Sequence, residues 1–220
     1  MVVMIENKVE KYKFLGFELS KWDIIGLIIA LILLVFSASV SMSHNLVGWQ
    51  KTLFYDINNW PNLFKTPALI ITEALGAGYP IAVCVLVPII FKNYKLAWKF
   101  FVTVGGAGLI MEIAKHIVKE PRPVVMLSGH LHERAIETGL TSYPSGHAAV
   151  ATAMALTLWM VLPKKWRFLS VLWILLVLIS RLYLGVHTPL DVIGGFAIGF
   201  LAFLIIKVLP RSFAKKVYLD

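Results

Sequence analysis

The chain has 220 residues, of which 59% are hydrophobic and only 15% are charged, and its mean hydropathy is +0.79. A soluble domain is nearer half apolar and a quarter charged, so this composition excludes a soluble globular protein. The net charge of +9 would suit a nucleic-acid partner, but the lysines lie between apolar segments rather than on one basic face. They therefore favour a membrane topology and no nucleic acid. The single cysteine, Cys84, excludes an internal disulfide.

Six apolar stretches of 15 to 25 residues follow one another along the chain, and about 20 helical residues cross a bilayer core. The first lies behind a lysine-bearing segment and resembles a secretory signal, with Ser37-Ala38-Ser39 as a site for cleavage. Because its leading segment is long and partly acidic, we interpret it as a membrane anchor. The sequence predicts an all-α polytopic bundle with spans at Ile24–Met42, Pro67–Phe91, Leu96–Val118, Ala148–Leu162, Trp166–Tyr183 and Pro189–Leu209.

The distribution of positive charge predicts the orientation of this bundle. With six spans, 14 of the 21 lysines and arginines fall on the side that holds both termini. The positive-inside rule therefore predicts a multi-pass protein of the cytoplasmic membrane with both termini in the cytoplasm. Residues 45–66 then lie outside, and their aromatic side chains predict an interfacial helix. No repeat or second domain is evident, so residues 1–220 form one domain.

Polar residues from four separate segments converge on the outer face under this topology. Charged groups near a bilayer are costly, and a cluster of them marks a functional site. Three cations suit a dianion, because arginine offers a fork of donors that matches phosphate oxygens and lysine adds a point charge. The converging residues are Lys115, Arg122, Ser145, Gly146, His147, Arg181, His187 and Asp191.

The stretch 141-TSYPSGHAAV-150 begins the fourth span with a possible anion site. Backbone N–H groups at a helix N-terminus bind anions. Pro144 fits the first helical turn, Ser145 offers its hydroxyl, and Gly146 permits close approach of a ligand. We therefore expect a phosphate-sized anion at this helix end.

The two histidines suggest chemistry beside that anion. His187 precedes the sixth span, for which Thr188 is a predicted N-cap and Pro189 the first residue. Asp191 can orient the His187 ring and leave its other nitrogen as a nucleophile or base. A Thr-x-x-Asp helix cap is the structural alternative for Asp191. His147 is placed to protonate a departing oxygen as general acid.

Three segments resemble the signature motifs of the type 2 phosphatidic acid phosphatase (PAP2) superfamily. They are Lys115-x6-Arg122-Pro123, Pro144-Ser145-Gly146-His147 and Ser180-Arg181-x5-His187-x3-Asp191, which occur in this order with no motif position replaced. The motif-bearing core covers 115–191. The layout is most similar to bacterial membrane enzymes of the phosphatidylglycerophosphate phosphatase B and undecaprenyl-pyrophosphate phosphatase kind.

The resemblance implies an enzyme that hydrolyses the terminal phosphate of a lipid phosphate or diphosphate. Candidate substrates are phosphatidylglycerophosphate, phosphatidic acid and undecaprenyl pyrophosphate. It implies that His187 forms a phosphohistidine, that Asp191 orients it and that His147 acts as acid and then base. Lys115, Arg122, Arg181, Ser145 and Gly146 would bind the phosphate. No metal, cofactor or obligate protein partner is implied.

Two other functions remain open from the sequence, and some polar residues remain without a role. The motifs do not recognise lipid tails, so a soluble phosphate ester is an alternative substrate, and a lipid transporter or flippase with an anion site is another. A vanadate-dependent haloperoxidase conflicts with the bilayer-spanning layout. Glu73 is a secondary site candidate, and the loop 119–143, with His130 and His132, could cover the site.

Overall fold

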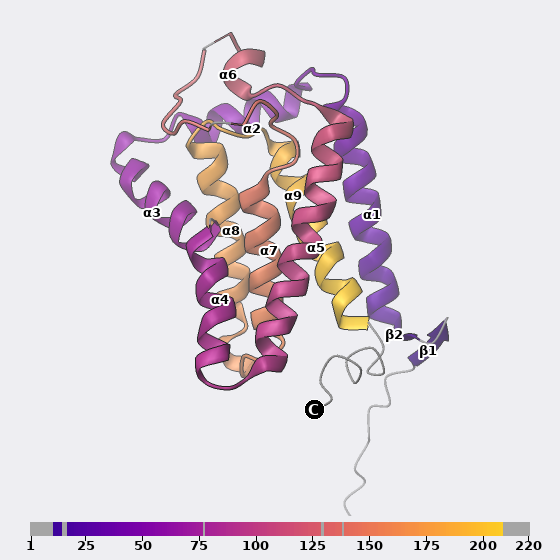
Figure 1. The fold of residues 1–220 in the computed structure, drawn as a ribbon. Coiled ribbons are helices and arrows are strands. Elements are labelled where there is room, and N and C mark those ends of the chain that lie inside the picture. Colours follow the sequence, from indigo (N-terminus) through magenta and orange to yellow (C-terminus); the bar gives the residue numbers. More distant parts are fainter. Residues whose placement is uncertain (1–10, 15–16, 77, 129, 138, 209–220) are drawn as a thin grey trace, which may run out of the picture.

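The computed structural model describes residues 11–14, 17–76, 78–128, 130–137 and 139–208, with side chains from Ser20 onward. These residues form a helical bundle with one short hairpin (Figure 1). The elements are β1 (Lys11–Phe14), β2 (Phe17–Ser20), α1 (Lys21–Ser41), α2 (Gly48–Asn58), η1 (Asn62–Phe64), α3 (Lys65–Gly76), α4 (Gly78–Ile90), α5 (Tyr94–Val118), α6 (Pro123–Met126), α7 (Gly146–Trp159), η2 (Lys164–Trp166), α8 (Phe168–Tyr183) and α9 (Pro189–Val208).

Four helices of the described chain are long and apolar enough to cross a membrane, or five if a bent pair counts as one span. The four are α1, α5, α8 with η2, and α9. The predicted second span is the bent pair, because its two halves, α3 and α4, meet at 42° around the Gly76–Gly78 break. The predicted fourth span is α7, an apolar helix of only 14 residues. Helices account for most described residues of all six predicted stretches, and Ala77 in the second and Leu209 at the end of the sixth lie outside the described residues. These apolar helices indicate a multi-pass membrane protein.

Small residues allow α7 and α9 to pack closely in the middle of the bundle. A methyl group added at Gly195 would lie 2.4 Å from the Ser145 carbonyl oxygen, and one at Gly199 would lie 2.4 Å from that of Ala149. Glycine at both positions therefore removes the atoms that would separate the two backbones. Ala149 and Ala153 of α7 and Ile198 of α9 are fully buried in the resulting core.

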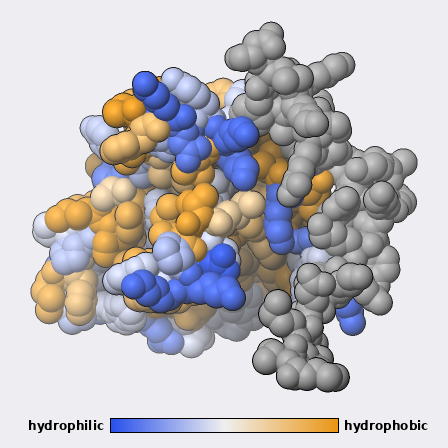
Figure 2. Space-filling model, turned by 90° about the horizontal axis from the view of Figure 1, so that it is seen from below, coloured by the Kyte–Doolittle hydropathy of each residue, from blue (hydrophilic) through white to orange (hydrophobic). Residues whose placement is uncertain are grey.

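The outer helices present apolar side chains to the surroundings. On α1, Ile32 and Val35 are 61% and 62% exposed, and on α5, Leu109 and Ile117 are 65% and 62% exposed. Large exposed aliphatic side chains along two helices suit lipid rather than water. Figure 2 views the end of the bundle opposite α2, where hydrophilic residues lie beside apolar ones.

The first and last spans are joined at the end of the bundle that carries β1 and β2. Ser20 and Asp23 form a capping box at the start of α1, with Asp23 N bonded to Ser20 Oγ at 3.2 Å. Asp23 also pairs with Lys207 near the end of α9. α1 therefore begins where α9 ends (Figure 1). The sequence did not predict the hairpin that precedes α1.

A short helix and an arginine organise the opposite end. α2 lies across the top of the bundle in Figure 1, and it is the helix predicted within 45–66. Arg134 is 9% exposed and donates to the carbonyl oxygens of Asn58, Tyr183 and Trp60 at 2.6, 3.0 and 3.1 Å. Its guanidinium also lies 4.3 Å from the centre of the Tyr183 ring. Arg134 thus ties the long loop before α7 to both α2 and α8.

Candidate active site

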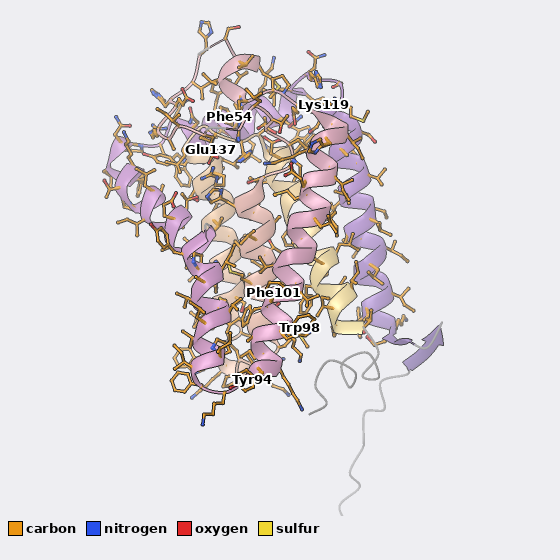
Figure 3. The ribbon with its side chains drawn as sticks, viewed as in Figure 1. Phe54, Tyr94, Trp98, Phe101, Lys119 and Glu137 are labelled. Atoms are coloured by element: carbon orange, nitrogen blue, oxygen red, sulfur yellow. The ribbon has the colours of Figure 1, made fainter. Side chains whose placement is uncertain are left out.

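The predicted polar residues lie at the end of the bundle near α2, where four segments meet. These are the end of α5 with the loop to α6, the start of α7, the end of α8 and the start of α9 (Figure 1). In Figure 3, Glu137 lies at this end near Phe54, whereas Tyr94 and Trp98 mark the opposite end. The predicted convergence of these segments on one end is therefore observed.

The start of α7 is held directly against the start of α9. Ser145 is the N-cap and is fully buried, and its Oγ accepts from Ala148 N at 3.4 Å. Its own N–H donates to the Asp191 carbonyl oxygen at 3.0 Å. Pro144 lies before the cap, not in the first helical turn as predicted, because Ser145 takes the capping position. At Gly146, the space of a side chain is filled by Met111 Sδ, 3.0 Å from an added Cβ.

His187 and Asp191 are brought together with a third residue, Ser142. The His187 Nδ1 lies 3.4 Å from Asp191 Oδ2 and 3.3 Å from Ser142 Oγ. The Ser142 hydroxyl donates to the same Asp191 oxygen at 2.6 Å. Both roles considered for Asp191 are compatible, because Oδ2 also accepts from Thr188 N at 2.6 Å and completes the predicted Thr-x-x-Asp cap. Asp191 and Ser142 are fully buried.

The other ring nitrogen of His187 faces an arginine. Arg122 Nη1 lies 3.3 Å from His187 Nε2 and 3.1 Å from the Val186 carbonyl oxygen. Because a guanidinium only donates, this contact requires a lone pair on Nε2 and places the ring proton on Nδ1. Burial lowers the pKa of His187 to about 4, so the ring is neutral at physiological pH. The unprotonated Nε2 of His187 therefore lies on the side of the cations, with its lone pair directed at Arg122.

A carboxylate occupies the space between the two arginines. Glu137, from the loop before α7, forms an ion pair with Arg181 and lies 3.7 Å from Arg122 Nη2. Burial by itself would raise the pKa of Glu137, but the positive charge of Arg181 lowers this pKa below its usual range. Arg181 is 1% exposed, and its Nη1 also donates to Thr72 Oγ1 at 2.9 Å. The arginines therefore already hold an anion in this structure.

His147 lies in the first turn of α7. Its charge interactions include Arg181, Glu137 and His187. The buried Nε2 of His147 and the Nε of Arg181 have no hydrogen-bond partner among the described residues. A buried polar atom without a partner is costly and suits a site where a ligand supplies the missing bond.

Among the predicted phosphate ligands, Lys115 has no recorded contact with the other site residues in the described part of the chain. It is half-buried in the last turn of α5, and no hydrogen bond or ion pair of its Nζ is recorded within the described ranges. Glu112, one turn earlier, lies 3.5 Å from His116 rather than pairing with Lys115. Glu73 on α3 is exposed and acts on Arg181 through its charge.

Sequence reasoning missed Ser142, Glu137, Thr72 and Glu120. Ser142 lies within 141-TSYPSGHAAV-150, but nothing in its spacing indicates a bond to Asp191 of α9. Glu137 lies in a loop without periodicity. His130 and His132 are exposed, and His132 contributes backbone bonds to Asn58. In the part of the chain that the structure describes, no group of three or more His, Cys, Asp or Glu side chains is arranged to hold a metal ion.

Comparison with known proteins places this site in a family. The chain is 28% identical over 193 residues to an undecaprenyl-diphosphatase of Sulfolobus acidocaldarius, which covers 87% of this chain and 93% of that relative. It is 32% identical over 127 residues to the phosphatidylglycerophosphatase B of Bacillus subtilis, covering 52% of this chain and 59% of that relative. The crystal structure of Aquifex aeolicus LpxE matches with a TM-score of 0.67 at 25% identity, over 73% of this chain and 96% of LpxE.

The family match spans the whole motif-bearing core. Residues 96–214 match the PAP2 superfamily, a range that begins in α5 and includes all three motifs. The relatives named above are phosphatases, which agrees with the enzyme class predicted from the motifs. By its sequence, its helical fold and the arrangement of its motif residues, the chain belongs to the PAP2 superfamily.

Proposed function

We propose that this protein is a membrane phosphatase that removes the terminal phosphate from a lipid phosphate or diphosphate. The observation that carries the proposal is the Glu137 carboxylate between Arg181 and Arg122, beside the unprotonated Nε2 of His187. An anion site that adjoins a neutral nucleophile has the parts required for phosphoryl transfer. The substrate phosphate would take the place of the Glu137 carboxylate.

In the first half of the reaction, His187 Nε2 attacks phosphorus. The N–P bond forms while the bond from phosphorus to the leaving oxygen breaks, and His147 donates a proton to that oxygen. The Nδ1–H of His187 remains directed at Ser142 Oγ and Asp191 Oδ2, which stabilise the positive charge that develops on the ring. Asp191 thus acts as orienting residue, as the family resemblance implies.

In the second half, water hydrolyses the phosphohistidine. His147 accepts a proton from the water, the new O–P bond forms, the N–P bond breaks and inorganic phosphate leaves. Arg122 and Arg181 bind the equatorial oxygens in both steps, and Lys115 would turn towards them from α5. Backbone N–H groups at the start of α7, with Ser145 and Gly146, complete the phosphate site. These cations would supply the charge that a metal ion supplies in other phosphoryl-transfer enzymes.

A lipid substrate is supported by the position of the site and by the relatives. The cluster lies at one end of an apolar bundle, where a lipid headgroup would lie when its tails remain in the bilayer. The names of two relatives, undecaprenyl-diphosphatase and phosphatidylglycerophosphatase B, refer to a lipid diphosphate and a lipid monophosphate. We extend this substrate class to the present chain.

We further propose one domain of six spans in the cytoplasmic membrane. The bent pair α3–α4 would be the second span and the short α7 the fourth. Both termini would be cytoplasmic, because most of the lysines and arginines then lie inside. The site would face the extracytoplasmic side, with no obligate protein partner.

The decisive experiment is release of inorganic phosphate by the purified protein in the presence of EDTA. The panel contains phosphatidic acid, phosphatidylglycerophosphate, undecaprenyl pyrophosphate and a soluble sugar phosphate. We expect turnover of lipid phosphates, inhibition by vanadate, and loss of activity in His187→Ala by about 10³-fold or more. Glu112→Gln, exposed on α5, is the matched control and keeps activity.

Each rival has its own outcome in this experiment. Preference for the sugar phosphate would indicate a soluble phosphate ester as substrate. If His187→Ala kept full phosphate-linked activity in proteoliposomes, the result would indicate a transporter with an anion site rather than an enzyme. Complete loss of activity with EDTA would contradict the metal-free mechanism.

A further inference from the structure

One buried carboxyl group has no role in the mechanism described above. Glu120 lies between α5 and α6, is 3% exposed, and its Oε2 has no hydrogen-bond partner among the described residues. An ionised carboxylate buried without a partner is strongly unfavourable, so such a group becomes neutral or acquires a partner. Glu120 therefore requires an explanation within the proposed site.

A second buried carboxyl oxygen without a partner belongs to Asp191. Its Oδ2 accepts from Ser142 Oγ and from Thr188 N, whereas its Oδ1 is buried with no partner in the described part of the chain. The Asp191 charge acts on Glu120, and Ser142 bonds to both residues, to the Glu120 carbonyl oxygen at 2.7 Å and to Asp191 Oδ2 at 2.6 Å. Two acceptor oxygens that face one another are both satisfied if a single proton lies between them.

The backbone holds Glu120 in this position. The carbonyl oxygen of Glu120 accepts a hydrogen bond from Ser142 N at 2.7 Å. The neighbouring residues Pro121 and Thr141 are paired by an isolated antiparallel β-bridge. Ser142 is also the residue whose hydroxyl donates to Asp191 Oδ2. Ser142 therefore fixes the Glu120 backbone on one side and the Asp191 carboxylate on the other.

We propose that Glu120 is a neutral carboxylic acid that donates its proton to Asp191 Oδ1 and acts as a positioning residue for the His187–Asp191 pair. The inference rests on the proposed role of His187 and Asp191. The Glu120 proton would hold the Asp191 carboxylate with Oδ2 towards His187 Nδ1. It would also keep the pair of carboxyl groups at a single negative charge.

The electrostatic surroundings agree with this assignment. Burial, followed by the negative charge of Asp191, raises the pKa of Glu120 to about 10. The other groups around the two carboxyls are Tyr143, whose pKa burial raises to about 12, the Ser41 hydroxyl of α1, His187, and Arg122, whose charge acts on Asp191. Arg122 and His187 act on the Asp191 side of the pair, which keeps the negative charge there.

Three variants test the role of the proton. Glu120→Gln keeps the shape and an N–H donor, so we expect its kcat and KM at pH 7 within about threefold of the wild type. Glu120→Ala leaves Asp191 Oδ1 without a partner, and a hydrogen bond to a charged group is worth about 1.5–3 kcal/mol. Its kcat should fall about 10- to 100-fold with little change in KM. Glu112→Gln is again the matched carboxyl control.

The pH profile distinguishes a positioning role from simple packing. In the wild type, kcat should fall as pH rises through about 10, where Glu120 ionises and loses its donor. Glu120→Gln cannot ionise and should lack this limb. Arg122, Lys115 and Tyr143 are common to both proteins, so the difference between the two profiles isolates Glu120.

Thermal stability provides a readout that does not require activity. A folded-state pKa of about 10 means that the folded protein binds one more proton than the unfolded chain from about pH 4.5 to 10. The stability that this proton contributes to the wild type is lost as pH rises through that range. The stability of Glu120→Gln does not change for this reason, because glutamine does not titrate. The Tm of Glu120→Gln relative to the wild type should therefore rise from pH 5 to pH 9.

The possible results separate failure of this inference from failure of the proposed function. Equal damage in Glu120→Gln and Glu120→Ala, or a constant difference in Tm across pH, would overturn the neutral acid. A lower Tm in Glu120→Ala with unchanged kcat would show that Glu120 has a structural role only. If Glu120→Ala fails to fold, the pH profile of kcat and the pH dependence of Tm in Glu120→Gln still test the neutral acid. Absence of phosphate release from the wild type on every substrate would instead overturn the proposed function.

Discussion

At the scale of single residues, the site is defined by which atoms of each side chain are already in use. His187 uses Nδ1 towards Ser142 and Asp191, and its Nε2 lone pair faces Arg122. Arg181 and Arg122 are both in contact with Glu137. The proposed nucleophile and its cations are thus arranged before any substrate binds, which lowers the reorganisation needed at the moment of reaction.

Glu137 provides a prediction at this scale. Because a phosphate has to displace the Glu137 carboxylate from the arginines, Glu137→Gln should strengthen inhibition by vanadate. If the ion pairs of this partly exposed carboxylate together contribute about 1 kcal/mol, losing them corresponds to about a fivefold lower inhibition constant. The measurement is vanadate inhibition of phosphate release. Glu133→Gln, exposed in the same loop, is the control, and weaker vanadate binding by Glu137→Gln would show instead that the carboxylate assists the anion.

At the scale of elements, the contact between α7 and α9 brings the motifs together. Ser145 N donates to the Asp191 carbonyl oxygen, so the second and third motifs are joined by a direct backbone hydrogen bond. Gly195 and Gly199 permit this approach, since an added methyl at either would lie 2.4 Å from a carbonyl oxygen of α7. His147 and Asp191 depend on this spacing because each lies in the first turn of its helix.

The glycine contact leads to a prediction about stability. Gly199→Ala should separate α7 from α9 and lower the free energy of unfolding by about 1–3 kcal/mol, a typical cost of overpacking a core. The Tm in detergent measures the loss, and kcat should fall with it. Gly105→Ala on α5 is the control, because an added methyl there has no neighbour within 4 Å. An unchanged Tm in Gly199→Ala would contradict the tight contact.

At the scale of the whole molecule, the two ends of the bundle differ in chemistry. One end carries the buried charges of the site beneath α2 and the loop that Arg134 anchors. The other carries the turn with Lys164 and Lys165 and the Asp23–Lys207 pair. This asymmetry agrees with a site on the outer side and a basic inner side.

The orientation can be measured with single cysteines on intact cells. In a Cys84→Ala background, His130→Cys should react with an impermeant thiol reagent, because its loop lies on the proposed outer side. Lys165→Cys, exposed at the opposite end, should be protected until the membrane is opened. The reverse pattern would overturn the topology.

Much of this arrangement could be predicted from sequence alone. Apolar runs about 20 residues long indicate membrane helices because lipid offers no hydrogen bonds to an open backbone. Helices account for most described residues of all six predicted stretches, and the 14 residues of α7 match the short fourth span predicted at Ala148–Leu162, whereas the 42° bend after Gly76 was not expected. The motif spacing placed Arg122, His147, Arg181, His187 and Asp191 at one end because consecutive antiparallel helices return there.

The sequence by itself determined the helical class, the family and the end of the bundle that holds the motif residues, because these depend on local hydropathy and on fixed spacing. Only the tertiary structure decided that Ser142 contacts both His187 and Asp191, that Glu137 lies between Arg181 and Arg122, and that Glu120 is buried and bonded through its backbone to Ser142. These contacts join a loop without periodicity to helices that lie far from it in the sequence. Their formation depends on how closely α7, α9 and that loop pack, which no local pattern encodes.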